Sequence, residues 1–510
     1  MSEQLSVRRS PLAHQSAAAR RSREWIIALP LALLIALLAL INLPYAPPTW
    51  FDEGSHLHVP KTLVRYGVYA DISSEGFRYF GPTIGVGPTV MLPVAAAFKL
   101  GGVGLLQARL VIVAYMALAL VALYFLARRL YGWQVAMLAV LLALASRTLR
   151  FEGLIEYGRQ ALGEVPGIAF LLLGLLGYSA AILRPATARR SSLLAGLAFG
   201  LALVTKNQFV LIVLPSLALL ALLDWLYYRA GNWWVRLAPL MIATACFTIW
   251  TVVMFTFFGP DGFAANLAKT RQAAGGAIFV FDTQASLRAA RYLIQVYGGL
   301  LLPGLAYGLW RARTRSPWAL THLAATLMAV LWLAWFMISL GWPRYAFPAV
   351  ILGSFTTALL AYDLFQALWK RQRTAPAWLG AAYLALVILV PLALSTRGVL
   401  SPRYAAHEMA AYLDRNVPVG PIIETWEPEM GVLTDHNYHY VPTELLDPAV
   451  RHVWLGGPPV QYNGLEARPP YVLLGPFSAY TRIYPDEVLA RDYQVIYTAE
   501  PYRLLQRSGP

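Results

Sequence analysis

Eleven apolar stretches, each suited in length to a helix that crosses a lipid bilayer, constrain this chain more than any other feature of its sequence. A hydrocarbon core about 30 Å thick requires roughly 20 apolar residues in helical form. The stretches cover residues 25–43, 106–127, 134–148, 164–183, 191–205, 208–227, 237–258, 289–310, 318–340, 345–367 and 377–395. An apolar content of 58% with only 13% charged residues excludes a soluble multidomain protein. The first stretch is longer than the h-region of a signal peptide and lacks a cleavage site, so we expect it to be retained.

The positive charges indicate how these stretches are oriented. The net charge is +15, yet residues 401–510 carry 8 Lys+Arg against 13 Asp+Glu, so the positive excess lies among the spans. If the Gly- and Pro-broken segment Pro82–Leu100 does not cross, all arginine-dense short loops fall on one face: Arg20, Arg21, Arg23, Arg128, Arg129, Arg184, Arg189, Arg190, Arg229, Arg236, Arg311, Arg313, Arg315, Lys370, Arg371 and Arg373. Cytoplasmic loops of membrane proteins carry such an excess. We therefore predict a multi-pass protein of the cell membrane with a cytoplasmic N-terminus, an outer C-terminus, an interfacial or re-entrant Pro82–Leu100, and no nucleic-acid partner.

The chain then divides into three parts. Residues 1–24 form a basic, disordered cytoplasmic tail, and residues 25–397 form the membrane module, with outer loops at 44–105 and 259–288. Residues 398–510 form a small α/β domain outside the membrane, with an expected helix at Tyr404–Leu413 and strands within Pro421–Trp426, Tyr471–Leu474 and Gln494–Tyr497. The run Asp435–His439 is predicted to be a polar surface loop. Most unusual chemistry lies in the outer loops.

Two adjacent carboxylates, Asp52 and Glu53, follow the first span within about ten residues. Ionisable groups held close to a bilayer usually face a cavity or a partner and mark a substrate pathway. The alternative is a structural role, since both would favour the N-terminal end of a helix at about 53–66 through its dipole. Local sequence leaves both readings open.

A second charged set precedes the span that begins at Glu164. It comprises Arg147, Arg150, Glu152, Glu156, Arg159 and Glu164. Glu164 lies nearest the membrane, and helical spacing would place Glu156, Gln160 and Glu164 on one face. Arg147 and Glu152 fit a solvated loop of opposite charges equally well. Glu164 is therefore the strongest functional candidate of this set.

Two cations lie at the outer ends of spans, where they could meet an anion. Lys206 connects two apolar stretches, and Arg344 precedes Tyr345 at the start of another. Arginine can hold a phosphate with two hydrogen bonds. The simpler readings are a lysine that extends to the membrane interface and an arginine that pairs with an outer carboxylate.

Metal and nucleotide chemistry have weaker support. The sequence requires no cofactor, although His56 and His58, near Asp52 and Glu53, could supply ligands to a divalent metal ion. Cys246 is the sole cysteine, which excludes an intrachain disulfide and a cysteine-based metal site. Neither a Walker motif nor a G-x-S-x-G motif is present, so a nucleotide-driven pump and a serine hydrolase lack support.

The order of these motifs resembles the GT-C class of membrane glycosyltransferases, specifically glycosyltransferase family 39, which includes protein O-mannosyltransferases and the aminoarabinose transferase of lipid A. The resemblance covers roughly residues 50–348. It rests on Asp52-Glu53, Tyr66-Gly67-Val68-Tyr69, Ala108-Arg109-Leu110, Ala127-Arg128-Arg129-Leu130-Tyr131-Gly132, Gly158-Arg159-Gln160-Ala161-Leu162-Gly163-Glu164, and Arg344-Tyr345 with Pro348. The second acidic motif departs from several relatives in carrying glutamate where they carry aspartate.

The resemblance implies an inverting glycosyltransferase that moves a sugar from a polyprenyl-phosphate donor to an acceptor hydroxyl of a lipid, glycan or protein on the outer face. It implies a GT-C-like fold in which Asp52, Glu53 and Glu164 are the catalytic acids. Cationic stabilisation of the leaving phosphate would come from residues placed near them: Arg159, Lys206, Arg344 and Tyr345. The alternative function is a transporter or flippase of lipid-linked or charged solutes, because charges within polytopic proteins also mark transport routes.

Overall fold

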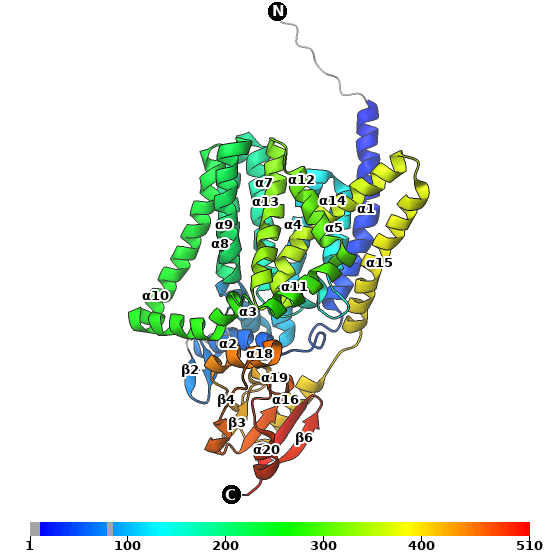
Figure 1. Ribbon diagram of the computed structural model, residues 1–510. Helices are drawn as coiled ribbons and strands as arrows, with labels where there is room; N and C mark the ends of the chain where they lie inside the picture. Colours follow the sequence, from blue (N-terminus) through cyan, green and yellow to red (C-terminus); the bar gives the residue numbers. More distant parts are fainter. Residues whose placement is uncertain (1–10, 79–84, 510) are drawn as a thin grey trace, which may run out of the picture.

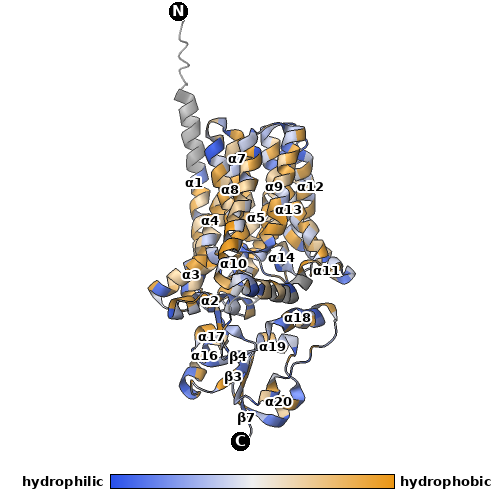
Figure 2. Cartoon of the chain, turned by 90° about the vertical axis from the view of Figure 1, so that its left-hand side faces the viewer, coloured by the Kyte–Doolittle hydropathy of each residue, from blue (hydrophilic) through white to orange (hydrophobic). Residues whose placement is uncertain are grey.

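The computed structural model describes residues 11–78 and 85–509, which form a helical bundle with a small sheet domain at one end (Figure 1). Among the described residues, seven helices are long and apolar enough to cross a membrane. They are α4 Leu105–Tyr131, α7 Glu164–Leu183, α9 Gln208–Leu223 with its extension η2 Asp224–Tyr228, α10 Trp233–Ile278, α13 Pro317–Ile338, α14 Pro343–Lys370 and α15 Thr374–Val399. Figure 2 shows apolar residues concentrated in the bundle and polar residues more frequent in the sheet domain. The chain is a multi-pass membrane protein.

Four predicted spans take other forms. The prediction of one straight helix over residues 289–310 is wrong, because the chain bends there by 79°. The bend lies between α11 Thr283–Gln295 with η3 Val296–Gly299 and α12 Leu301–Arg311. Counted together as one broken span, these helices would be the eighth span. The same criterion of length and composition leaves out three further predicted spans, which are α1 Pro11–Leu40, α5 Trp133–Leu144 and α8 Ala188–Thr205. The predicted disorder of the basic tail is also wrong from Pro11 onward, since α1 begins there.

Helix α10 extends 20 residues beyond the stretch that ends at Phe258, because the chain turns at Gly259 and continues as a helix. Gly259 has φ of 69°, a left-handed conformation that glycine adopts without steric cost. Figure 1 shows the part of α10 after this turn running across the end of the bundle next to the sheet domain.

The segment predicted to be the first outer loop contains α2 Phe51–Tyr66, the hairpin β1 Asp71–Ser73 and β2 Gly76–Arg78, and α3 Pro88–Gly101. Residues 82–84 of the segment predicted to be interfacial or re-entrant lie outside the described residues. Its helical part α3 has 14 residues, or about 21 Å, which is shorter than a hydrocarbon core. Gly87, at the start of α3, packs so closely on Val204 that a Cβ atom would lie 1.8 Å from the Val204 carbonyl oxygen. Glycine is therefore required where the first loop meets α8.

The C-terminal domain has the predicted α/β architecture. Its helices are α16 Ala405–Asn416, α17 Pro428–Leu433, α18 Leu446–Leu455, α19 Pro476–Thr481 and α20 Asp486–Asp492, with short turns η4 Thr443–Leu445 and η5 Gly464–Ala467. Its strands β3 Ile422–Thr425, β4 Asn437–Tyr440, β5 Tyr471–Leu474, β6 Tyr493–Ala499 and β7 Tyr502–Arg507 form a sheet in the order β4-β3-β5-β7-β6. Strands β4, β3 and β5 are parallel, and β7 pairs antiparallel to both neighbours. The prediction of a loop at Asp435–His439 is wrong, because this run continues into β4.

The C-terminal domain packs directly on helix α2. His58 Nε2 lies 2.7 Å from the carbonyl oxygen of Pro428. Lys61 Nζ donates to two carbonyl oxygens at the C-terminal end of α17, those of Gly431 and Thr434, at 2.6 Å each. A cation at a helix C-terminus is favourable because it meets unpaired carbonyl groups and the negative end of the dipole. The domain therefore fixes the helix that carries Asp52 and Glu53.

Candidate active site

Helix α2 directs its two adjacent carboxylates to different partners. It begins after Trp50, whose backbone is extended, and places Asp52 and Glu53 in its first turn. Consecutive side chains on an α-helix project about 100° apart. The Asp-Glu pair therefore divides between two neighbouring sets of charges.

Asp52 faces a set of buried charges from three other segments. Arg344, in the first turn of α14, donates from Nη1 to Oδ2 of Asp52. Its Nε lies 3.1 Å from Oε1 of Glu164, the first residue of α7, as an ion pair without hydrogen-bond geometry. Lys206, between α8 and α9, donates from Nζ to the same oxygen. The structure thus brings together four predicted site residues, which we call the charged centre.

The charged centre is enclosed most tightly around Glu164. Side-chain exposure is 2% for Glu164, 10% for Lys206, 12% for Arg344 and 21% for Asp52. Burial lowers the pKa of Lys206, although the charge of Glu164 opposes this effect. Within the described residues, Oε2 of Glu164 is buried without a hydrogen-bond partner. Two carboxylates and two cations balance one another, and Asp52 is the member most accessible from outside.

Two aromatic rings hold the guanidinium of Arg344. Its Cζ lies 5.4 Å from the ring centre of Trp50 and 5.5 Å from that of Trp342. Guanidinium groups are weakly hydrated and stack favourably on aromatic faces. Tyr345, the next residue, packs its ring on Trp335 at 5.5 Å between centres. The aromatic setting therefore restricts where Arg344 can move.

Glu53 belongs to a separate ion pair. Arg109, in the second turn of α4, donates from Nε and Nη2 to the two carboxylate oxygens of Glu53 at 2.9 and 2.6 Å. The amide N–H of Ala161 donates to Glu53 Oε1 at 2.9 Å. Both side chains are fully buried. This pair holds three segments together, and its members lie outside the charged centre.

Arg159 is also occupied by the backbone. Its guanidinium donates to the carbonyl oxygens of Ala46, Leu38 and Ile41 at 2.8, 2.5 and 2.5 Å. The side chain is fully buried. These bonds fix the end of α1, so the structure does not support the prediction that Arg159 meets the donor phosphate.

Members of the second charged set interact with one another and with α15. Arg147 donates to Oε1 of Glu156 at 2.6 Å, and Ser395 donates to the same oxygen at 2.7 Å. The expectation that Glu156 and Glu164 share a helical face is wrong, because α6 Leu154–Tyr157 ends before α7 begins. Burial raises the pKa of Glu152 to about 7, and the charge of Glu156 adds to the rise. Arg147 is among the cations that oppose it.

The two histidines on α2 each contact protein atoms. Nδ1 of His56 lies 3.0 Å from the carbonyl oxygen of Ala161, so this nitrogen carries the proton. Both nitrogens of His58 are engaged, Nδ1 with Asp71 at 2.8 Å and Nε2 with Pro428 at 2.7 Å. In the described part of the chain, no group of three His, Cys, Asp or Glu side chains converges. Both nitrogens of His58 and one nitrogen of His56 are therefore engaged by protein atoms.

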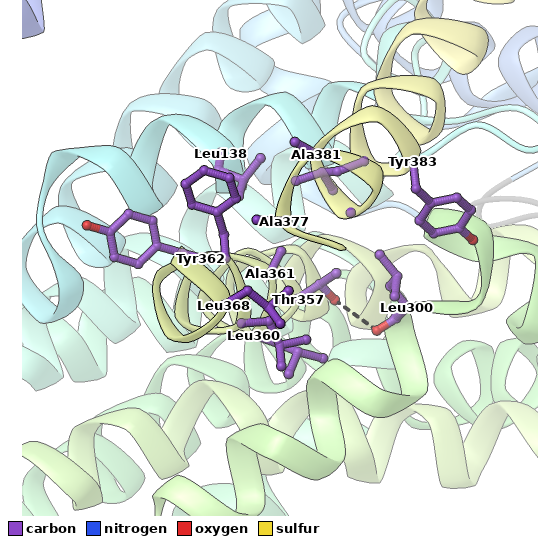
Figure 3. Close-up of a pocket in the computed structure, with 14 residues that line it drawn as sticks. Leu138, Leu300, Thr357, Leu360, Ala361, Tyr362, Leu368, Ala377, Ala381 and Tyr383 are labelled. Atoms are coloured by element: carbon purple, nitrogen blue, oxygen red, sulfur yellow. Dashed lines mark hydrogen bonds between the residues drawn. The ribbon is translucent and has the colours of Figure 1, made fainter. Parts of the chain in front are cut away.

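The bundle contains an apolar cavity of about 360 Å³ that is distinct from the charged centre. It lies among α5, α14, α15 and the junction of η3 with α12, and its lining includes Leu138, Leu300, Ala361 and Tyr383 (Figure 3). Ala361 is 17 residues beyond Arg344 along α14, or roughly 25 Å at 1.5 Å per residue. The lining contains no charged side chain, so this cavity suits hydrocarbon and is not the place where a charged group would react.

Sequence reasoning missed Arg109, Trp50 and Trp342 as partners of the predicted acids and cation. Arg109 had a signal, because an arginine near the start of an apolar span needs a partner. Its pairing with Glu53, 56 residues away, has no local signature.

Comparisons with known proteins identify a related family model and similar folds. The family model for dolichyl-phosphate-mannose-protein mannosyltransferases matches residues 86–256, about a third of the chain. A search of curated proteins finds no match. The crystal structure of ArnT from Cupriavidus metallidurans bound to undecaprenyl phosphate is similar with a TM-score of 0.60 at 15% identity, covering 95% of this chain and 99% of that chain. Archaeal AglB from Archaeoglobus fulgidus, an oligosaccharyltransferase in complex with an inhibitory peptide and a dolichol-phosphate, has a TM-score of 0.56 at 12% identity, covering 95% and 75%. The chain has the fold of these GT-C proteins, and the resemblance predicted from its motifs is confirmed.

Proposed function

We propose that this protein is a membrane glycosyltransferase that transfers a sugar from a polyprenyl-phosphate carrier to an acceptor hydroxyl on the outer face of the cell membrane, with inversion. The observation that carries the proposal is the charged centre of Asp52, Glu164, Lys206 and Arg344. It combines an accessible carboxylate with two cations beneath an extramembrane domain. Similar folds bind undecaprenyl phosphate in ArnT and a dolichol-phosphate in AglB.

The reaction needs a base and a site for the leaving phosphate. The acceptor oxygen forms a bond to the anomeric carbon of the donor sugar while the bond from that carbon to the carrier phosphate breaks. Asp52 takes the proton of the acceptor hydroxyl. The phosphate retains the electron pair of the broken bond, and Lys206 and Arg344 stabilise the charge that develops there. A single displacement inverts the anomeric configuration.

The ion pair between Arg344 and Asp52 couples donor binding to activation of the base. Without donor, the guanidinium donates to Oδ2 of Asp52, so this oxygen is not free to meet an acceptor hydroxyl. A donor phosphate competes for the same guanidinium, because arginine binds carboxylate and phosphate alike. Binding of the phosphate would thereby free Asp52 for the acceptor. Glu53 and Arg159 act as scaffold in this scheme, since their polar groups are already paired.

The proposed orientation of the protein in the membrane is supported by the charged residues at each end of the spanning helices. Glu164 and Arg344 lie at the N-terminal ends of α7 and α14, whereas Arg184 and Lys370 lie at or beside their C-terminal ends. The basic clusters thus lie at the opposite end of the bundle from the charged centre, which supports a site on the outer face.

The test is sugar transfer by the purified full-length protein in liposomes. Radiolabelled polyprenyl-phosphate hexoses and pentoses are supplied with cell-envelope extract, and covalent product is measured. Wild type should transfer one of these sugars, and Asp52→Asn should lower the rate of transfer by about 10² to 10⁴-fold. The matched control is Asp261→Asn, an exposed aspartate on α10. Movement of labelled solute across sealed vesicles without a covalent product would instead establish the transporter.

A further inference from the structure

Three tryptophans form a row that starts at the charged centre and ends on the C-terminal domain. The guanidinium of Arg344 lies between the rings of Trp50 and Trp342, at 5.4 and 5.5 Å. The Trp342 ring stacks on that of Trp454 with 6.3 Å between centres and 29° between planes. Trp50 precedes α2, Trp342 precedes α14, and Trp454 lies on α18. Three distant segments therefore converge on one aromatic surface, which we call the tryptophan row.

The outer end of the row is held in place by other residues. The indole N–H of Trp454 donates to the carbonyl oxygen of Leu340 at 2.9 Å. Arg288, on α11, places its Cζ 5.3 Å from the Trp454 ring centre and donates to the Trp454 carbonyl oxygen. The ring is thus fixed between the membrane module and the C-terminal domain. A rigid ring binds a ligand at little cost in conformational entropy.

The indole N–H groups nearest the charged centre are available. Within the described chain, those of Trp50 and Trp342 have no hydrogen-bond partner and are not enclosed. By contrast, the buried Trp332 and Trp335 donate to the backbone at 2.6 and 3.0 Å. All three rings of the row are partly exposed. The row therefore offers apolar surface together with free donors, a combination suited to a ligand with both C–H and hydroxyl groups.

A lipid-facing belt is the alternative explanation for tryptophan at a membrane surface. Belt residues point outward into the interface. Here the three rings contact one another or Arg344, and all three pack against the core of the C-terminal domain that includes Phe51 and Trp426. This placement favours a binding surface between the two parts of the protein.

We infer that Trp50, Trp342 and Trp454 form the subsite that binds a sugar ring of the acceptor. The inference rests on the proposed function and deepens it, because it makes the acceptor a carbohydrate or a glycolipid headgroup. The donor phosphate belongs at Arg344 and Lys206, and its hydrocarbon chain must lie among the spans. The row runs the other way, from Arg344 toward α18, where an acceptor from outside would enter. Pyranose C–H groups pack on indole faces, while sugar hydroxyls accept from the free N–H groups of Trp50 and Trp342.

Kinetics of the full-length protein in liposomes test the subsite. Trp454→Ala should raise the KM for envelope glycan extract about tenfold, the equivalent of losing one aromatic contact. The KM for the polyprenyl-phosphate donor should stay unchanged, and Trp454→Phe should restore most of the loss. Trp225→Ala removes a tryptophan that is 63% exposed at the other end of the bundle and should behave as wild type. If the Trp454 variants do not fold, Trp342→Phe, which keeps an aromatic ring but removes a free N–H donor, should raise the acceptor KM by a smaller factor.

The chemistry of the product separates this inference from the proposed function. Label should be released by periodate and glycosidases and should resist protease. Label that is attached to protein, or an acceptor KM that is unchanged in both Trp454→Ala and Trp342→Phe, would overturn the subsite while leaving the glycosyltransferase intact. Failure of wild type to transfer any label would instead overturn the proposed function.

Discussion

Two groups of acids, one in the charged centre and one inside the C-terminal domain, are stabilised in opposite ways. In the charged centre, Asp52 and Glu164 each contact a cation. In the C-terminal domain, Glu427 and Glu429 are fully buried near one another, and within the described residues neither pairs with a cation. Glu427 instead accepts from the backbone N–H groups of Phe477 and Ser478 at 3.2 and 2.8 Å.

The comparison shows how the same residue type serves two purposes. Burial raises the pKa of both domain glutamates, and repulsion from Glu427 raises that of Glu429 further, which favours the protonated form of Glu429. Glu429 accepts from the hydroxyl of Tyr502 at 2.8 Å. A carboxylate paired with a cation responds to competing anions, whereas a carboxyl pair that holds a proton responds to pH. We expect the first site to act on substrate and the second to act on stability.

The two regions meet on helix α2. Gly54, two residues after Asp52, packs against the backbone of Glu429, where a Cβ atom would lie 2.2 Å from the Glu429 amide nitrogen. The acid pair therefore supports the helix that presents Asp52 without contacting the charged centre itself.

The largest expected difference between the two regions is in catalysis. Asp52→Asn should lower the rate of sugar transfer by about 10² to 10⁴-fold, the range typical for loss of a general base. Glu429→Gln should leave transfer within about twofold of wild type, because a neutral group of the same shape replaces a protonated carboxyl. Initial rates in liposomes measure both. Equal losses of transfer rate in the two variants would contradict the assignment of catalysis to the charged centre alone.

The sequence predicted the fold well where the length of an apolar stretch determines the element. The predicted stretch 164–183 coincides with α7, and strand β5 has the predicted bounds. The bend between α11 and α12 and the turn at Gly259 were not predictable, because long apolar or mixed sequences carry no local mark of direction. Strand β4 is polar at Asn437 and His439, and its assignment depends on pairing with β3.

The sequence predicted which residues form the candidate site better than it predicted which of them pair with one another. Sidedness placed Asp52, Glu164, Lys206 and Arg344 on one face, and the structure brings them together. Which acid meets which cation depends on tertiary contacts, such as the pair of Asp52 and Arg344, 292 residues apart. For the same reason, Arg159 was expected at the phosphate but binds backbone carbonyl groups at the end of α1.

The next largest effect concerns the neighbour of Asp52. Glu53→Gln should destabilise the protein by about 3 kcal/mol, because Arg109 is left buried without its counter-charge. Thermal unfolding in detergent measures the change, and Glu53→Gln combined with Arg109→Gln should recover part of it. A loss of transfer with unchanged stability would place Glu53 in catalysis with Asp52.

A smaller effect is expected from Lys206, the cation that donates a hydrogen bond to Glu164. Lys206→Met should raise the KM for the polyprenyl-phosphate donor about tenfold, since one of two phosphate-stabilising cations is lost. Lys99→Met, an exposed lysine at the end of α3, is the matched control. An increase confined to the acceptor KM would move Lys206 away from the donor phosphate.

The smallest expected effect is a pH dependence of stability in the C-terminal domain. Burial raises the pKa of Glu427 to about 7, above its value in the unfolded chain, and Glu429 shifts in the same direction. Between about pH 4.5 and 7 the native state therefore binds more protons than the unfolded state, so stability should fall as pH rises through this window, by about 1 kcal/mol per pH unit for one proton. Glu429→Gln should flatten this slope because Gln carries its hydrogen at every pH. Hydrogen exchange of β3 and α19 in the full-length protein measures it, and an undiminished slope in the variant would show that the proton is held elsewhere than by this pair.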